Sequence, residues 1–187
     1  LAWYLGQRNP DLARWAAVGT LTLLLLLTLP LLPDALSTPI HQQSGMHWLL
    51  LEQHDWIPRF GISILLALDG LSLLLVILTL VLGLVAVAAS WQEITDQVGF
   101  FHFNLLWSLA GVLGVFMALD LFLFFFFWEV MLIPMYFLIG IWGHENRHYA
   151  AIKFFIFTQA SSLLMLVSIL ALAYLHQQQN GTYSFNY

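Results

Sequence analysis

The most informative side chain for chemistry is that of Glu129, which stands in the apolar stretch FFFFWEVMLIP over residues 124–134. A carboxyl group at that depth in hydrocarbon is costly and usually marks a proton or ion pathway. Without a partner in a low-dielectric medium the group keeps its proton, whereas beside a lysine or arginine it gives the proton up. Glu129 is therefore the first candidate for proton transfer, and the alternative is a structural acid bonded to a neighbouring helix.

Pro134 follows Glu129 by five residues in the same stretch. A proline within a helix leaves the carbonyl four residues earlier, here that of Val130, without its usual donor. Such a carbonyl can accept a hydrogen bond from water where it faces protein or a hydrated cavity. Pro134 thus either helps to hydrate the acid or merely kinks the helix.

Lys153 is the other candidate for proton transfer, because it stands near the start of an apolar run. Its long side chain can reach the membrane surface and act as an interfacial anchor. A place in a proton relay is the alternative, and the sequence leaves both interpretations open.

Asp69, Asp120 and His102 are further polar residues within or beside apolar runs. Asp69 and Asp120 stand where helices are expected to begin, and a carboxylate is favoured there as an N-cap. A lateral or exit role in proton movement is the alternative for both. His102 stands near the start of a helix, where we expect it at the membrane interface. The spacing of the histidines does not match that of a metal site, so no metal is expected.

The elements that must position these residues follow from composition. Of the 187 residues, 61% are hydrophobic and 8% are charged, against roughly 25% charged residues in a soluble domain. Several apolar runs reach the length of about 18 residues that lets a helix cross a bilayer. The sequence therefore predicts an all-α, polytopic membrane helical bundle that is surrounded by the lipid bilayer.

Charge and motifs exclude several classes of function. The formal net charge is -5, and no basic cluster is present, which argues against nucleic acid as a partner. The chain has no cysteine, so thiolate metal sites and iron–sulfur ligation are excluded. No phosphate-binding loop, dinucleotide fingerprint, nucleophile elbow or zinc motif is present. We therefore expect no redox or other bond chemistry, and no bound cofactor, in this chain itself.

Five membrane-spanning helices are expected. From Phe100 to Gly143 there is no hydrophilic loop, and a single helix of that length would be about twice as long as the ~30 Å hydrocarbon core. The run must therefore turn, and Asp120 is the expected position. The loop over residues 30–61 has room for a short surface hairpin. The expected helices cover residues 12–29, 62–90, 101–119, 121–142 and 150–176.

Basic residues set the expected orientation, because Lys and Arg are enriched on the cytoplasmic side of membrane proteins. Arg59 stands on one side of the five-helix topology, and four basic residues stand on the other: Arg8, Arg14, Arg147 and Lys153. The segments expected to be cytoplasmic are 1–11, 91–100 and 143–149. Those expected to be periplasmic are 30–61 and 177–187. The chain begins at Leu1 rather than Met, so we expect it to be part of a longer protein.

Several longer motifs resemble a known family. They are FFHFNL over residues 100–105, ALDLFLFFFFWE over 118–129, PMYFLI over 134–139, WIPRFGIS over 56–63, LDGLS over 68–72 and KFFIFTQAS over 153–161. Together they resemble the subunit M (subunit 4) family of antiporter-like membrane subunits of respiratory complex I, the proton-translocating NADH:quinone oxidoreductase. The resemblance covers most of the chain from about Trp56 onward.

The resemblance implies two inverted helical repeats, of which this chain holds five spans of the first. Glu129 falls on the family's essential glutamate, which pairs with a lysine on a later, discontinuous helix outside this chain. NADH, FMN, iron–sulfur clusters and quinone are implied to be bound by other subunits of the complex. The implied share of this subunit is proton movement across the inner membrane of a bacterial cell. Its implied partners are the other membrane subunits of complex I, including neighbouring antiporter-like subunits.

Three alternatives stay open on the sequence. A subunit of a multi-subunit sodium/proton antiporter shares the acid-bearing helix, and a membrane-bound hydrogenase subunit is a closer alternative. The PRFG segment over residues 58–61 and the phenylalanine run before Trp128 favour complex I over the antiporter. The third alternative is a scaffold without transport, and the position of Glu129 in hydrocarbon speaks against it.

Overall fold

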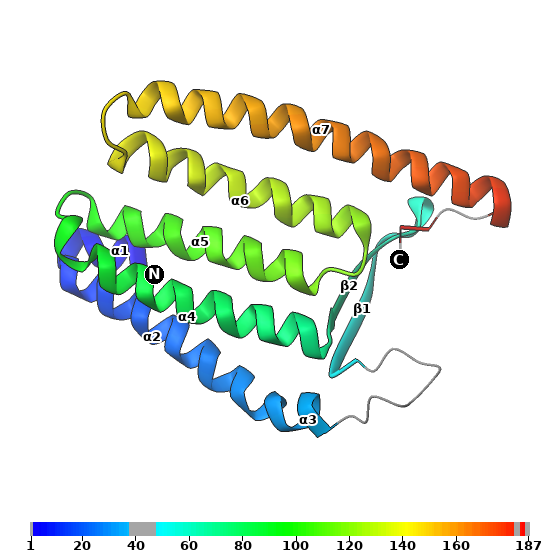
Figure 1. Ribbon diagram of the computed structural model, residues 1–187, viewed down its shortest axis with the longest axis horizontal. Helices are drawn as coiled ribbons and strands as arrows, with labels where there is room; N and C mark the ends of the chain where they lie inside the picture. Colours follow the sequence, from blue (N-terminus) through cyan, green and yellow to red (C-terminus); the bar gives the residue numbers. More distant parts are fainter. Residues whose placement is uncertain (1, 38–47, 182–183, 186–187) are drawn as a thin grey trace.

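The computed structural model describes residues 2–37, 48–181 and 184–185, and its long helices run side by side in one bundle (Figure 1). Two strands form a hairpin at one end of that bundle. The helices are α1 (Ala2–Arg8), α2 (Pro10–Thr28), the 3-10 turn η1 (Leu29–Leu31), α3 (Leu32–Ser37), α4 (Gly70–Glu93), α5 (Val98–Met117), α6 (Leu121–Trp142) and α7 (Arg147–Asn180). The strands are β1 (Leu50–Ile57) and β2 (Ile62–Leu68), joined by the 3-10 turn η2 (Pro58–Phe60).

Five helical segments within the described residues are long and apolar enough to cross a membrane. The predicted helical membrane bundle with five spans is therefore confirmed. The spans are Pro10–Ala35, Gly70–Glu93, Val98–Met117, Leu121–Trp142 and Arg147–Gln179.

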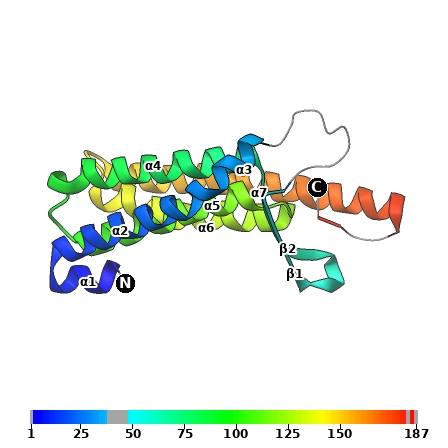
Figure 2. The ribbon, with the colours of Figure 1, turned by 90° about the horizontal axis from the view of Figure 1, so that it is seen from below.

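The long helices pack in a simple order. Helix α5 packs against α4 and α6, α6 packs against α7, and α2 packs against α4 and α5. Helix α1 and the α4–α5 and α6–α7 connections lie at one end of the bundle, whereas the hairpin and the α5–α6 turn lie at the other (Figure 1). Figure 2 shows the hairpin projecting from its end of the bundle. The two ends thus differ in structure as well as in sequence.

The turn expected at Asp120 is present. Helix α5 ends at Met117, and α6 begins at Leu121 after Asp120, which is its N-cap. The Asp120 side chain is fully buried, and its Oδ1 accepts hydrogen bonds from the backbone N–H groups of Phe122 at 2.8 Å and Leu123 at 3.0 Å. The carboxylate therefore satisfies two of the unpaired donors that begin a helix.

The helix predicted over residues 62–90 was wrong at its start. Ile62–Leu68 forms strand β2, which pairs antiparallel with β1 from Leu50 opposite Leu68 to Ile57 opposite Ile62. The chain reverses at Gly61, whose φ of 69° favours glycine. Strand β2 is mostly buried and β1 is mostly exposed. A buried strand that runs directly into an apolar helix has no polar gap to mark the boundary.

Other helix ends differ from the expected ones by a few residues. Helix α2 begins at Pro10 rather than residue 12, because Asn9 caps it and a proline suits the first turn. Helix α5 begins and ends earlier than expected, and α7 extends further at both ends. Helix α6 covers residues 121–142, as the sequence indicated. The short helix α1 within segment 1–11 was not expected.

Close packing of α5 on α6 depends on two glycines. A Cβ at Gly111 would lie 2.7 Å from the Cβ of Met131, and one at Gly114 would overlap the ring of Phe127. Small residues let membrane helices approach each other closely. These contacts also fix which residues of α6 face α5, and Glu129 is not among them.

Candidate functional site

Glu129 lies on the side of α6 that faces α7. Residues 122, 125, 129, 136 and 140 form one stripe of α6, because steps of three, four or seven residues return to the same side of a helix. The Tyr136 ring lies 5.8 Å from that of Phe155, and a Cβ at Gly140 would lie 3.5 Å from the Cβ of Ala151. This stripe is therefore the contact surface with α7.

The antiparallel register of α6 and α7 places Ser162 opposite Glu129. Tyr136 is opposite Phe155, and Phe122 packs on the cluster that contains Ile169. Ser162 is the residue of α7 that stands seven before Ile169 and seven after Phe155. It is buried, and its hydroxyl donates to the Gln159 carbonyl at 3.0 Å. The hydroxyl oxygen keeps lone pairs that can accept a further hydrogen bond.

The Glu129 carboxyl group is incompletely satisfied. Its side chain is half-buried, and Oε1 is buried with no hydrogen-bond partner among the described residues. A buried polar oxygen without a partner is costly and calls for a proton, a water or a cation. Oε1 therefore keeps lone pairs that no described residue uses.

Pro134 lies within α6 and is fully buried. The helix continues past it, so the carbonyl of Val130 lacks the donor that residue 134 would otherwise supply. That carbonyl is one residue from Glu129 along the chain. Pro134 stands seven residues after Phe127 and so lies on the side of α6 that faces α5, whereas Glu129 lies on the side that faces α7.

The structure does not bring Lys153 and Glu129 together. Lys153 is exposed, and its Nζ lies 5.7 Å from the centre of the Tyr149 ring. It precedes Ser162 by nine residues, roughly 13 Å along the helix. It also lies on the side of α7 away from Ala151, which contacts α6. This position fits an interfacial anchor better than a relay partner of Glu129.

Asp69 and Asp120 both cap helices, as expected. The Asp69 carboxylate accepts from the Ser72 backbone N–H at 2.7 Å. Burial raises the pKa of Asp69, but hydrogen bonds from Ser72 and nearby backbone amides lower it by more, so the net pKa lies below the usual 3.8. A cavity of about 510 Å³ lies between these two acids at the hairpin end.

His102 lies near the start of α5, inside the bundle. Its side chain is fully buried, and its Nδ1 lies 2.8 Å from the Val98 carbonyl oxygen. The sequence analysis used Arg14 only to predict orientation and did not predict that its side chain is partly buried. The Nε of Arg14 and the Nε2 of His102 are both buried without partners among the described residues. The available signal for Arg14 was its position a few residues inside an apolar run.

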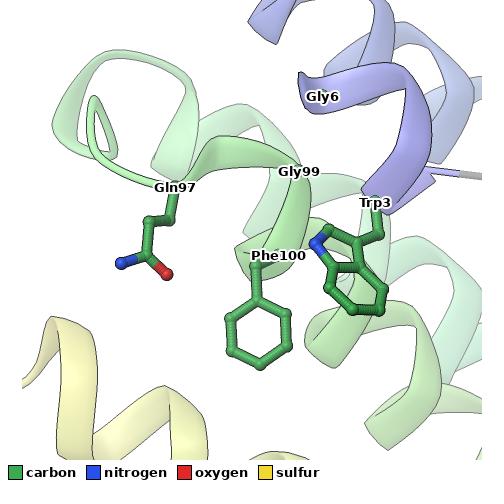
Figure 3. Close-up of a pocket in the computed structure, with 5 residues that line it drawn as sticks. All are labelled: Trp3, Gly6, Gln97, Gly99 and Phe100. Carbon is green, nitrogen blue, oxygen red and sulfur yellow. The ribbon is translucent and has the colours of Figure 1, made fainter. Parts of the chain in front are cut away.

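The described residues contain no group of three or more His, Asp and Glu side chains that could hold a metal ion. A second cavity, of about 400 Å³, lies between α1 and the start of α5, where Trp3 and Phe100 stand side by side and Gln97 lies on the other side of Phe100 (Figure 3). Gly6 and Gly99 complete its lining. These five residues carry no carboxyl or basic group, so the cavity offers no proton-transfer chemistry.

Comparison with known sequences identifies relatives. The family model described as NADH:quinone oxidoreductase/Mrp antiporter, TM matches residues 118–187. The chain is 52% identical over 193 residues to NADH-quinone oxidoreductase subunit M of Escherichia coli K12 and 50% identical over 194 residues to that of Pseudomonas aeruginosa. Each alignment covers 100% of this chain and 38% of the relative. The chain thus spans well under half the length of the curated relatives it matches.

Solved structures share the fold. A chain of respiratory complex I from Thermus thermophilus with bound NADH superposes with a TM-score of 0.72 at 26% identity, covering 92% of this chain and 33% of that one. A chain of the Mrp complex from Dietzia sp. superposes with a TM-score of 0.73 at 22% identity, covering 97% of this chain and 18% of that one. The second likeness concerns the fold alone. With the motifs, the five spans and the buried acid of α6, these relatives establish that the chain belongs to the antiporter-like membrane-subunit family of NADH-quinone oxidoreductase subunit M.

Proposed function

We propose that this chain forms part of a complex I subunit that moves protons across a bacterial inner membrane, coupled to electron transfer from NADH to quinone. The observation that carries the proposal is the carboxyl group of Glu129, whose Oε1 is buried in a membrane-spanning helix without a partner among the described residues. The names of the relatives support the same function.

Glu129 would act by changing its protonation state. A cation that approaches the acid stabilises the carboxylate, and its withdrawal favours the protonated form. Lys153 is exposed and roughly 13 Å away along α7, so the cation must come from another part of the complete protein. The unused lone pairs of Oε1 would accept a hydrogen bond from an entering water.

The remaining chemistry belongs to other chains in this proposal. NADH, FMN, iron–sulfur clusters and quinone would be bound by other subunits of the complex, and this subunit would touch neighbouring antiporter-like subunits through its membrane helices. Large apolar side chains cover the outward faces of α7, where Leu164 is 71% exposed in the isolated chain. Such a face suits lipid or another membrane helix.

Orientation also remains part of the proposal. The end that holds α1 and the α6–α7 connection carries most of the basic residues, which supports a cytoplasmic position for that end. The hairpin end would then face the periplasm.

The test replaces Glu129 with Gln in the complete subunit, within the assembled complex in sealed vesicles. Glu129→Gln keeps the shape of the side chain but cannot release a proton. Quinone reduction by NADH should persist, while protons moved per electron should fall. Glu145→Gln changes an exposed acid in the α6–α7 connection and is the matched control. Full proton movement in the Glu129 variant would refute the proposal.

A sodium/proton antiporter subunit is the second candidate, because the description of the matching family model also names an antiporter. The two functions differ in whether proton movement requires sodium or requires NADH and quinone. Sodium-dependent proton exchange in vesicles that lack NADH would favour the antiporter. Proton movement that requires NADH and quinone would favour complex I.

A further inference from the structure

The junction of α2, α4 and α5 contains a second polar site, separate from that of Glu129. It is centred on His102, which is fully buried in α5. Its Nδ1 lies 2.8 Å from the carbonyl oxygen of Val98. A carbonyl only accepts hydrogen bonds, so Nδ1 carries the hydrogen, and in a neutral ring Nε2 is then an acceptor. This Nε2 is buried and has no partner among the described residues.

Arg14 of α2 lies at the same junction and is held on three sides. One guanidinium nitrogen bonds Asp11 at 2.8 Å, and the other donates to the Ile94 carbonyl at the end of α4 at 3.1 Å. The guanidinium also lies 5.6 Å from the centre of the Trp91 ring. Its third nitrogen, Nε, is buried without a partner in the part of the chain described. Arg14 therefore presents a fixed N–H group to the interior.

The two unsatisfied atoms are complementary, and their residues lie at the same level of the junction. A Cβ at Gly83 of α4 would lie 2.8 Å from Leu109 and 3.3 Å from Leu21. Leu109 stands seven residues after His102, and Leu21 stands seven after Arg14, so each pair lies on one side of its helix. One atom is a donor and the other an acceptor, yet they do not bond directly. Buried polar groups in native proteins are nearly always satisfied, often by an ordered water.

We propose that one buried water bridges Arg14 and His102 and thereby ties α2 and α4 to α5. The water accepts a hydrogen bond from Arg14 Nε–H and donates one to His102 Nε2. An anion could accept from Arg14 but could not donate to Nε2, so water fits the pair and chloride does not. The site stabilises the helix junction at the end of the bundle opposite the hairpin.

This water site lies on a different side of the α5–α6 pair from Glu129. Leu105 and Leu109 follow His102 on the same stripe of α5 and pack in the core that α2 and α4 form. Glu129 instead faces α7. The water is therefore a structural bridge, and it does not depend on the proposed proton transfer at Glu129.

The direct test is a map of the complete protein in lipid nanodiscs, at a resolution that shows ordered waters. We expect a density peak at about 2.7–3.2 Å from both Arg14 Nε and His102 Nε2. Absence of the peak, or a peak that contacts only one of the two atoms, would overturn the inference.

Substitution of the acceptor gives a second test. His102→Leu removes the acceptor at similar size, so the peak should vanish and the unfolding temperature of the complete protein should fall. His102→Gln keeps an oxygen that can accept from the water, so its unfolding temperature should fall by less. His144→Leu, at an exposed histidine in the α6–α7 connection, is the control and should change neither the density peak nor the unfolding temperature. Equal stability of His102→Leu and the unsubstituted protein would count against the bridge.

The unsubstituted protein can also decide the question if the variants fail to fold. Nitrogen-15 NMR of labelled histidine should show His102 with a protonated Nδ1, an unprotonated Nε2 and a correlation from Nε2 to water. A protonated Nε2, or no water correlation, would contradict the proposed bridge.

Discussion

Asp120 and Ser63 are joined by a hydrogen bond from the Ser63 backbone N–H to Asp120 Oδ2 at 3.1 Å, across 57 residues of sequence. The same carboxylate caps α6 through Phe122 and Leu123. One buried side chain therefore fixes the hairpin to the start of the helix that carries Glu129. The Leu119 N–H adds a second link, because it donates to the Leu65 carbonyl in β2 at 3.0 Å.

Removal of this carboxylate should destabilise the protein strongly. Asp120→Ala leaves two cap donors and one strand donor without a partner, and we expect a loss of about 2 to 4 kcal/mol in the free energy of unfolding. Asp69→Ala is the comparison, since a cap that bonds only residues in the first turn of its own helix should cost about 1 kcal/mol. Thermal unfolding of the complete protein in detergent measures both. Equal losses would show that the link to Ser63 does not stabilise the fold.

Stability should depend on the ionisation of Asp69 at acid pH. Hydrogen bonds outweigh burial and depress its pKa below the 3.8 of a free aspartate. Its stabilising contribution is therefore fully present above about pH 3.8 and is lost as the pH falls through the lower folded-state value. The stability difference between the unsubstituted protein and Asp69→Asn should stay constant from about pH 7 to pH 5 and shrink below about pH 4. A difference that does not shrink in acid would be inconsistent with a depressed pKa.

A side chain at Gly111 should force α5 away from α6. In Gly111→Ala the new Cβ would lie 2.7 Å from the Cβ of Met131, and overpacking of this kind costs about 1 to 3 kcal/mol. Gly19→Ala in α2 is the matched control, because nothing lies within 4 Å of a Cβ there. That control should be neutral or stabilising by up to about 1 kcal/mol. Chemical denaturation of the two variants makes the comparison, and similar losses would argue against close helix packing at Gly111.

Lys153 should matter for membrane anchoring rather than for proton transfer. It is exposed and lies over the Tyr149 ring at 5.7 Å, a contact worth about 0.5 to 1 kcal/mol at exposed sites. Lys153→Arg should be neutral, and Lys153→Ala should lower stability slightly while leaving the protons moved per electron unchanged. Loss of proton movement in a stable, assembled Lys153→Ala variant would restore the relay interpretation.

The sequence predicted the elements that depend on neighbouring residues along the chain. Apolar length identified the five spans, and the capping chemistry of Asp120 located the turn before α6. It failed where a strand continues directly into a helix, because Ile62–Leu68 is as apolar as α4. The pair Asp69-Gly70 was the available boundary signal, since Asp69 caps α4. Composition alone could not reveal that β2 is held by a residue 57 positions away.

The candidate site also has features that the sequence predicted and features that depend on packing between helices. A charged residue in hydrocarbon identified Glu129, but the stripe of α6 that faces α7 follows only from packing. The burial of His102 depends on α2 and α4 folding over α5, which its position near a helix start does not reveal. Pairings between distant helices thus decide which polar atoms remain unsatisfied.

Infrared difference spectroscopy of the complete, assembled protein tests the role of Glu129 most directly. During turnover with NADH and quinone, we expect a carboxyl C=O band that appears and disappears, shifts in heavy water and is missing in Glu129→Gln. Such a band would show that this acid is loaded with a proton and releases it. A carboxyl group of Glu129 that keeps one protonation state throughout turnover would contradict the account.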